Sequence, residues 1–212
     1  HPSRSYTLHA LGRHFAGHLA RIRPDRESTD GPDWADFARD LARFEWLIYE
    51  VFDGPGTEQL PPFTPQSLLD VPAARWSELQ LETAPCLRLL KTDFPINDYF
   101  TAARNSASKE APPAPEAAVS YVALTRRDYV VRRHPLSAAQ YEILARLQAG
   151  IDLERALQEV LTGEFSPNTE TSAEQVRSWF GLWTKEGFFT GYRLQGGEPA
   201  PAEKAAAPSP RD

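Results

Sequence analysis

Two stretches of biased composition limit what this chain of 212 residues can fold into. Residues 105–118 read NSASKEAPPAPEAA and residues 195–212 read QGGEPAPAEKAAAPSPRD, and neither stretch holds a large apolar side chain. Segments of this composition cannot bury enough surface to form a core, so we predict a linker and a disordered tail. This leaves two regions, 1–104 and 119–194, which we expect to be separately compact.

The first region has the periodicity of amphipathic helices. Apolar side chains recur at steps of three and four over 6–22 and over 34–51, and a Gly-Pro-Gly sequence ends the second helix. The predicted buried stripe of that second helix consists of Trp34, Phe37, Leu41, Phe44, Ile48 and Val51. A short strand near 79–83 and a short helix at 96–104 complete a region that we predict to be mainly helical.

The second region changes to the two-residue period of strands. Residues 119–133 predict a β-hairpin with its turn at Arg127-Asp128. Three helices follow, each opened by a capping residue: Ser137, Asp152 and Ser172. Residues 188–194 read as a returning strand. Hairpin, three helices and returning strand predict a winged-helix-like module, so the whole chain is expected to be α+β.

Charge and composition exclude some classes of function. The 23 Lys and Arg residues are outnumbered by 29 Asp and Glu, which excludes a surface-wide basic field for nucleic acid but leaves a local patch open. No apolar run approaches the roughly 20 residues of a membrane span. With one cysteine, Cys86, and no signal pattern, we expect a cytoplasmic protein without internal disulfides. Because the first residue is His1 rather than methionine, we expect further sequence upstream.

Four strings of the sequence resemble a bacterial family that is labelled as a DNA-binding domain. They are HPSRSYTLHALGRHFAGHL at 1–19, DFARDLARFEWLIYEVFD at 36–53, CLRLLKTDFPI at 86–96 and YVALTRRDYVVRRHPLSAAQYEILARLQAG at 121–150. The stretch at 40–46 is the most specific part, and none of the strings is a catalytic motif. Members of this family begin with several more helices upstream of the point matched by His1, and the DNA-binding label depends largely on those helices.

The resemblance implies a partner subunit rather than an enzyme. Family members are often encoded beside a barrel enzyme with a multinuclear non-haem iron centre, which oxidatively modifies cysteines in a ribosomally made precursor peptide. The family therefore implies that this chain binds the iron enzyme and presents the peptide, without a cofactor of its own. Its C-terminal module is similar to the small elements that bind leader peptides in such pathways.

Two local patterns could carry chemistry of their own. His14 and His18 stand four apart on a predicted helix with His9 nearby, but no third metal ligand is evident, so we interpret them as ordinary helix residues. Cys86 has no neighbouring base that would activate a nucleophile, and we predict a buried structural thiol. We therefore predict neither a catalytic residue nor a metal site.

The helix over 34–53 leaves two large aromatic residues off its apolar stripe. Trp46 and Tyr49 lie there together with Glu45 and Glu50. Facing carboxylates can bind iron, but a di-iron helix needs a Glu-x-x-His step that is missing here. We therefore predict that Glu45, Trp46, Tyr49 and Glu50 form the interface with the enzyme. The alternative is that Trp46 packs under the segment 55–72.

The second region combines arginines with aromatic residues, which are common anchors of interfaces. The four arginines between 126 and 133 could contact phosphate groups, an acidic peptide or the enzyme, or could simply be solvated. We predict that an extended peptide adds as a strand at 121–125 or 188–194. Its predicted contacts are Arg126, Arg132, Arg133, Trp179, Trp183 and Tyr192.

The sequence therefore predicts a non-catalytic accessory subunit that recognises a peptide. The alternative is a DNA-binding transcriptional regulator that uses the hairpin and the helix at 173–187, and a third possibility is a metal-dependent enzyme built on the histidine pair. The 9 basic and 9 acidic residues of 119–194 balance, which suits a peptide better than a polyanion.

Overall fold

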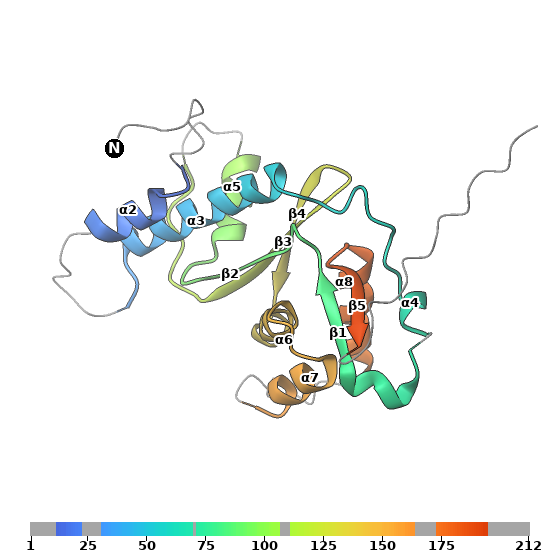
Figure 1. Cartoon of the computed structure of the whole chain (residues 1–212). Coiled ribbons are helices and arrows are strands. Elements are labelled where there is room, and N and C mark those ends of the chain that lie inside the picture. Colours follow the sequence, from blue (N-terminus) through green and yellow to red (C-terminus); the bar gives the residue numbers. More distant parts are fainter. Residues whose placement is uncertain (1–11, 23–30, 70, 107–110, 164–172, 195–212) are drawn as a thin grey trace, which may run out of the picture.

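The computed structural model of the chain describes residues 12–22, 31–69, 71–106, 111–163 and 173–194. Helices and two small antiparallel sheets make up the fold, which confirms the predicted α+β class (Figure 1). None of the described helices combines the length and apolar character that a bilayer span needs. In chain order the elements are α2 (Phe15–Ile22), α3 (Trp34–Asp53), α4 (Gln66–Leu69), η1 (Ala73–Glu78), β1 (Leu79–Thr83), β2 (Arg88–Thr92), α5 (Ile96–Asn105), β3 (Ser120–Arg127), β4 (Val130–Leu136), α6 (Ala138–Gln148), α7 (Leu153–Leu161), α8 (Ala173–Lys185) and β5 (Phe189–Leu194).

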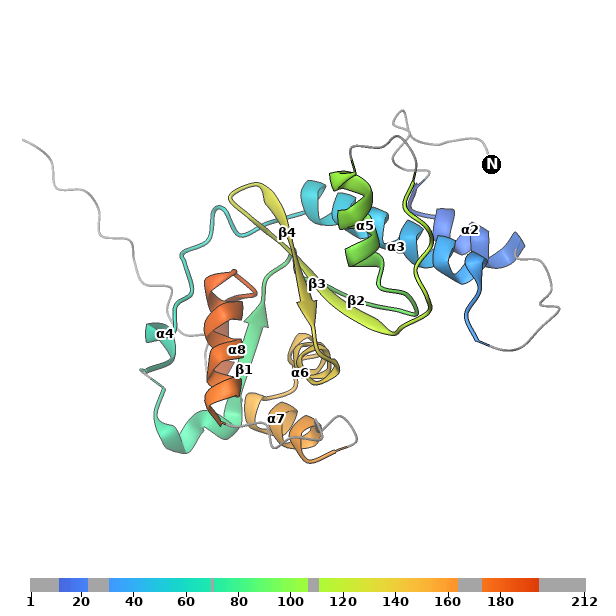
Figure 2. The same cartoon turned by 180° about the vertical axis from the view of Figure 1, so that it is seen from behind.

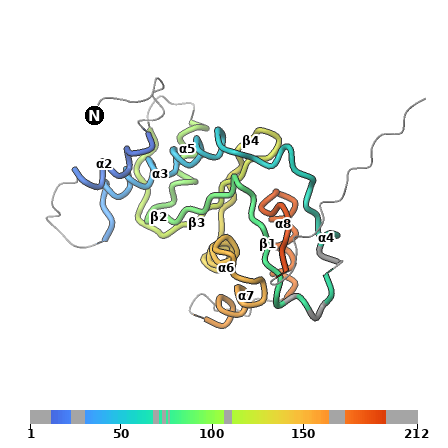
Figure 3. Tube along the Cα trace, viewed as in Figure 1, coloured from blue at the N-terminus to red at the C-terminus, as the bar shows by residue number. Residues whose placement is uncertain are grey.

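Both sheets join strands from the two regions that the sequence had suggested. In the three-stranded sheet β2 pairs with β3 and β3 with β4, so that Leu90 lies opposite Val122. In the two-stranded sheet β1 pairs with β5, and Leu81 lies opposite Tyr192. Figure 3 shows β1, in green, beside β5 and α8, in red.

One hydrophobic core runs through both predicted regions. Phe44 and Leu87 from the first region and Leu144 and Trp183 from the second are all buried in it. The two regions therefore do not pack as separate units, contrary to the prediction, because strands on either side of the predicted linker complete each other's sheets.

The predicted linker and tail are described only in part. Residues 111–118 have neither helix nor strand and lead into β3. Residues 107–110 and the predicted tail at 195–212 lie outside the described residues.

The long helix α3 confirms the clearest helix prediction. Asp33 caps its N-terminus in a capping box with Asp36, and the chain leaves the helix at Gly54. Phe44 is buried as predicted, but Trp34 has 69% of its surface exposed. Trp34 is the first residue of the helix and precedes the turns that contact the sheet, so its place on the stripe does not bury it.

The helices α3 and α6 cover opposite faces of the three-stranded sheet (Figures 1 and 2). Side chains alternate along β3, so that Tyr121 contacts Tyr141 of α6 whereas Arg126 contacts the end of α3. The helix α5 packs against α3. The strand β4, at the outer edge of the sheet, therefore has one face toward α3 and α5 and the other toward α6 and α8.

The elements after the linker follow the predicted order. The hairpin β3–β4 is confirmed, but its turn lies one residue later than predicted, at Asp128 and Tyr129, whose φ angles of 51° and 61° are left-handed. Ser137 caps α6 and Asp152 caps α7 as predicted, whereas Ser172 lies outside the described residues. The strands β1 and β5 are also confirmed, but their pairing with each other had not been expected.

Candidate functional site

The hairpin places its arginines on two faces of the sheet. Arg132 and Arg133 are adjacent in β4 and so point in opposite directions. Arg133 donates a hydrogen bond to Asn97 of α5, whereas Arg132 pairs with Glu186 directly after α8. Arg126 lies on the same face as Arg133 but contacts the end of α3. The predicted peptide contacts on the hairpin therefore do not form one surface.

Arg126 is a buried structural residue. Only 9% of its surface is exposed, and its Nε and Nη2 donate to the two carboxylate oxygens of Glu58 at 2.7 and 3.0 Å. Its Nη1 donates to the backbone carbonyls of Phe52 and Gly54 at the end of α3. Hydrogen bonding to Arg126 lowers the pKa of Glu58 in spite of burial. The predicted peptide contact through Arg126 is wrong, because its guanidinium is engaged inside the fold.

Arg132 lies on the face of β4 toward α8. Its side chain is 43% exposed and forms an ion pair of 3.3 Å with Glu186. Beside it, His134 packs edge-on against Phe188 with ring centroids 5.1 Å apart. Burial lowers the pKa of His134, and the positive charge of Arg132 acts in the same direction. This face of β4 thus combines one reachable cation with a histidine that favours its neutral form.

Arg133 is held against α5 on the opposite face. Its Nη1 donates to Asn97 Oδ1 at 2.9 Å and to Thr101 Oγ1 at 3.1 Å, and its guanidinium lies 5.1 Å from the ring centroid of Phe100. The guanidinium of Arg104 lies 5.7 Å from the same ring. These α5 residues had no predicted role; the one signal in the sequence was a cation, Arg104, in the last turn of the predicted helix at 96–104.

The predicted aromatic anchors are partly buried. Trp183 is 1% exposed and packs against Phe180 and Phe188, so its predicted role as a peptide anchor is wrong; the helical period turns it into the core. Its indole Nε1 has no hydrogen-bond partner within the described ranges. Trp179 lies tilted against Trp183 and is half-buried, as is Tyr192 on β5, so both keep some surface for contact.

The strand edges decide where a peptide could add. The strand β3 is central in its sheet, so the predicted addition at 121–125 is wrong. The strands β4 and β5 each pair with one strand in the described part of the chain, and each therefore has an outer edge. On β4 this edge stops at Pro135, which has no N–H to donate. At the other end Tyr129 and Val130 are 69% and 55% exposed.

On α3, Trp46 is covered from a direction that the sequence did not suggest. Its ring stacks on Tyr49 with 5.7 Å between centroids, and the guanidinium of Arg13 lies 5.9 Å from the indole centroid. A Cβ at Gly12 would lie 3.1 Å from Trp46 Cε3, so the backbone before α2 runs close to the indole. Trp46 is therefore shielded by the approach to α2 and not by the segment 55–72.

The two glutamates of the predicted enzyme interface differ in their surroundings. Glu50 accepts a hydrogen bond of 2.7 Å from Nε of Arg88 and so links α3 to β2. Glu45 is exposed on the surface of α3. Of the four predicted interface residues, Glu45 is the one that a partner could reach most easily.

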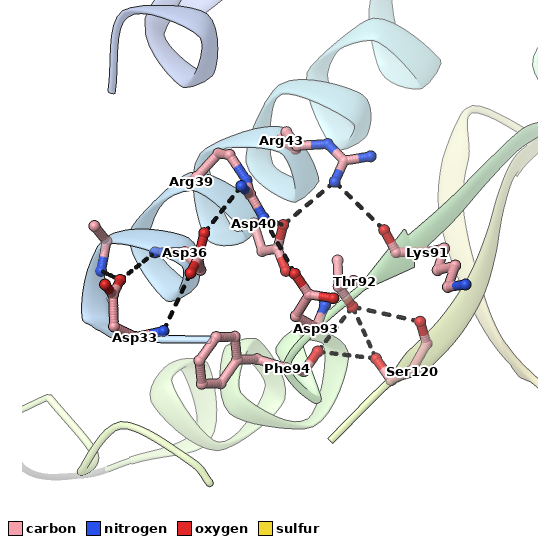
Figure 4. A network of polar contacts seen from close by, with 11 residues as sticks. Asp33, Asp36, Arg39, Asp40, Arg43, Lys91, Thr92, Asp93, Phe94 and Ser120 are labelled. Carbon is pink, nitrogen blue, oxygen red and sulfur yellow. Dashed lines mark hydrogen bonds and ion pairs between the residues drawn. The ribbon is translucent and has the colours of Figure 1, made fainter. Parts of the chain in front are cut away.

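A buried polar network ties α3 to the end of β2 (Figure 4). Asp40 is fully buried, and its Oδ2 accepts a hydrogen bond of 2.7 Å from the backbone N–H of Asp93. Its Oδ1 lies 3.4 Å from Arg39 and 3.3 Å from Arg43. This network was not predicted, because acidic and basic residues at helical spacing usually form a solvated face. The network positions α3 against the end of β2.

The other candidate residues show no reactive arrangement. No three His, Cys, Asp or Glu side chains come together as a metal site among the described residues, and His9 lies outside them. His14 and His18 are exposed. Cys86 is 2% exposed, and its Sγ accepts a hydrogen bond of 3.4 Å from the backbone N–H of Arg126, which confirms the buried thiol.

Comparisons with known proteins give no relative from which a function could be transferred. No protein family model, no curated protein and no solved structure matches the chain. The family resemblance of the sequence motifs therefore stays a prediction.

Proposed function

We propose that the chain is a non-catalytic accessory subunit, which binds a multinuclear non-haem iron enzyme and presents a ribosomally made precursor peptide to it. The observation that carries the proposal is the outer edge of β4, a strand that has a single neighbour in the described part of the chain. Such an edge offers unpaired backbone N–H and C=O groups to an extended peptide. The proposal that the partner is an iron enzyme comes from the resemblance of the sequence motifs to the family described above.

The proposed peptide-recognition module is winged-helix-like. It comprises the hairpin β3–β4, the helices α6, α7 and α8, and the strand β5, in the order that the sequence predicts. The structure differs from the predicted module in two ways: β2 adds a third strand to the hairpin, and β5 pairs with β1. A single buried cysteine agrees with a cytoplasmic location.

The usable edge of β4 is short. It extends from Val130 to His134, because the next residue, Pro135, cannot donate to an added strand. Five residues are enough for a specific contact when side chains on the two faces of the strand also contribute. The exposed Arg132 supplies a positive charge on the face toward α8. An extended peptide with acidic side chains fits this edge better than an apolar one.

The proposed enzyme-binding surface lies on α2 and α3. Phe15 and Ile22 of α2 are 50% and 59% exposed, and Trp34 at the start of α3 is 69% exposed. Large apolar side chains that are left open in this way are typical of interaction surfaces. Glu45 is exposed on α3, and beside it in the helix Trp46 stacks on Tyr49.

The peptide part of the proposal is tested by titration of the isotope-labelled full chain. The probe is the precursor peptide encoded nearest to the gene of this protein, and the readout is the backbone amide shifts. We expect shifts over 130–134 at about physiological salt. Shifts that avoid both strand edges would contradict strand addition, and the absence of any binding would contradict peptide presentation.

The enzyme part is tested by co-purification with the barrel iron enzyme encoded nearest to this gene. Phe15→Ser and Trp34→Ser should each weaken the complex about tenfold if these side chains are interface anchors. Leu182→Ser is the matched control, since Leu182 is also an exposed apolar residue, 47% exposed, but lies on α8. Equal effects of all three variants would refute the assignment of the surface.

The alternative, a DNA-binding regulator, has less support. Arg126 is buried, and Arg127 and Arg132 pair with Asp128 and Glu186. Duplex DNA forms a separate arm of the titration. Tight binding that weakens steeply with salt, together with no response to the peptide, would make the regulator the better description.

A further inference from the structure

Residues of α3, α5 and β4 line a small pocket on the face of the sheet opposite α6. Figure 2 shows where these three elements lie. The volume of the pocket is about 210 Å³, which suits one side chain rather than a whole small molecule. It is lined by Ile48, Phe100, Thr101, Arg104, Asn105, Val131 and Arg133. The lining thus combines an apolar floor with two guanidinium groups, a hydroxyl and an amide.

The two arginines of the pocket share one aromatic neighbour. Both guanidinium groups lie on the ring of Phe100, with Arg133 5.1 Å and Arg104 5.7 Å from the ring centroid. Burial and the charge of Arg104 lower the pKa of Arg133, while Asp98 acts in the opposite direction. The positive charge of Arg104 therefore acts on Arg133, and an anion in the pocket that both side chains line would offset this repulsion.

The charge of the pocket is not neutralised from within. Across the described ranges, no carboxylate lies within ion-pair distance of Arg104 or Arg133, whereas Arg126 and Arg132 each have a glutamate partner. Arg133 donates to Asn97 and Thr101 through Nη1, which fixes the guanidinium, and among the described residues its Nε and Nη2 have no hydrogen-bond partner. The pocket is therefore positively charged and preorganised.

We infer that this pocket binds an acidic side chain of a peptide that lies along the outer edge of β4. The inference rests on the proposed function, since it needs the peptide to add as a strand. Val131 and Arg133 alternate with residues that point away, so every second side chain of the added strand lies on their face. Cross-strand neighbours have Cβ atoms about 5 Å apart, which brings a carboxylate within reach of Arg133 and into the pocket that Arg104 also lines.

The apolar floor distinguishes an acidic side chain from a free inorganic anion. Ile48, Phe100 and Val131 can cover the methylene groups of a glutamate while its carboxylate meets the guanidinium groups. A phosphate ion has no apolar part that could use this floor. The pocket would therefore select an Asp or Glu at one fixed position of the peptide, and glutamate reaches deeper.

The test selects peptides from a displayed random library against the full chain at physiological salt. Selected peptides should share an acidic residue at one position, and replacing it with Gln or Asn should weaken binding about tenfold. In Arg104→Gln the acidic peptide and its Gln or Asn version should bind with nearly equal affinity. The variant should still fold, because Arg104 is exposed. Arg155→Gln is the control: it removes one positive charge from an exposed ion pair on α7.

Each result decides between distinct outcomes. The pocket assignment is overturned, but the proposed function stands, in either of two cases: peptides shift the amides of β4 without sharing an acidic residue, or Arg104→Gln and Arg155→Gln weaken peptide binding equally. Shifts on β5 alone overturn the pocket but not the proposed function, and if no peptide shifts the amides of either strand, both fail. Sodium phosphate is titrated alone, and shifts of Thr101 and Asn105 with phosphate but not with any peptide would identify an inorganic-anion site instead.

Discussion

Replacing Arg126 with methionine should strongly destabilise the fold. Methionine keeps much of the aliphatic stem but removes the guanidinium from Glu58 and from the carbonyls of Phe52 and Gly54. The side chains of this ion pair are only 10% and 12% exposed, so the abandoned carboxylate cannot be rehydrated without local opening. Removing one partner of a buried pair costs about 3–5 kcal/mol, and we expect a loss of that size.

The assay is urea unfolding of the full chain, followed by the fluorescence of its tryptophans. The free energy of unfolding should fall while the denaturant slope stays unchanged. Arg155→Met is the matched control, because that arginine and its partner Glu159 are 67% and 37% exposed, and exposed pairs contribute at most about 1 kcal/mol. The reasoning is refuted if Arg126→Met costs no more than Arg155→Met.

The same pair predicts a dependence on pH. Hydrogen bonding to Arg126 lowers the pKa of Glu58 below its ordinary value of 4.5, so the stabilisation is complete above that pH. It should be lost as the pH falls through the lower, folded pKa, because the unfolded chain takes up the proton first. In Glu58→Gln this part of the acid sensitivity should be missing, and an unchanged acid profile would contradict the assignment.

Three further outcomes are expected. Asp40→Ala should cost about 2–4 kcal/mol, since it leaves the buried N–H of Asp93 unpaired, whereas Asp53→Ala at the exposed end of α3 should cost little. Because burial lowers the pKa of His134 below 6.5, stability should fall as the pH drops from about 7 to 5, and His134→Gln should flatten this slope. Cys86 should react with a thiol reagent only as the chain unfolds, and rapid labelling of the native protein would show that the core is open there.

Local sequence signals were enough to predict the helices, but they could not predict which strands pair with each other. Capping residues and a regular apolar period mark α3, and both are local properties of its sequence. The strand β2 was not predicted, because its two leucines, Leu89 and Leu90, are adjacent and do not alternate with polar residues. The pairing of β1 with β5 joins residues 111 positions apart, such as Glu82 and Arg193, and no periodicity reports a contact over that distance.

The candidate site was predictable to a smaller extent. The two-residue period of a strand separates Arg132 from Arg133, so their opposite faces could have been read from the sequence. The burial of Arg126 could not, because its partner Glu58 lies 68 residues away in an irregular segment. The pocket escaped prediction for the same reason: its walls come from three elements, and only the fold brings Arg104 beside Arg133.

The pairing of β1 with β5 has a consequence for synthesis of the protein. A ribosome that adds 5–20 residues per second needs roughly 5–20 s to pass from β1 to β5. During that interval the nascent chain carries β1, with Leu79 and Leu81, without the strand that will cover its edge. Translation must run through Leu194 before the register of this sheet can close, and a message truncated shortly before that codon would release a chain with an open, apolar strand, a ready substrate for chaperones and for aggregation.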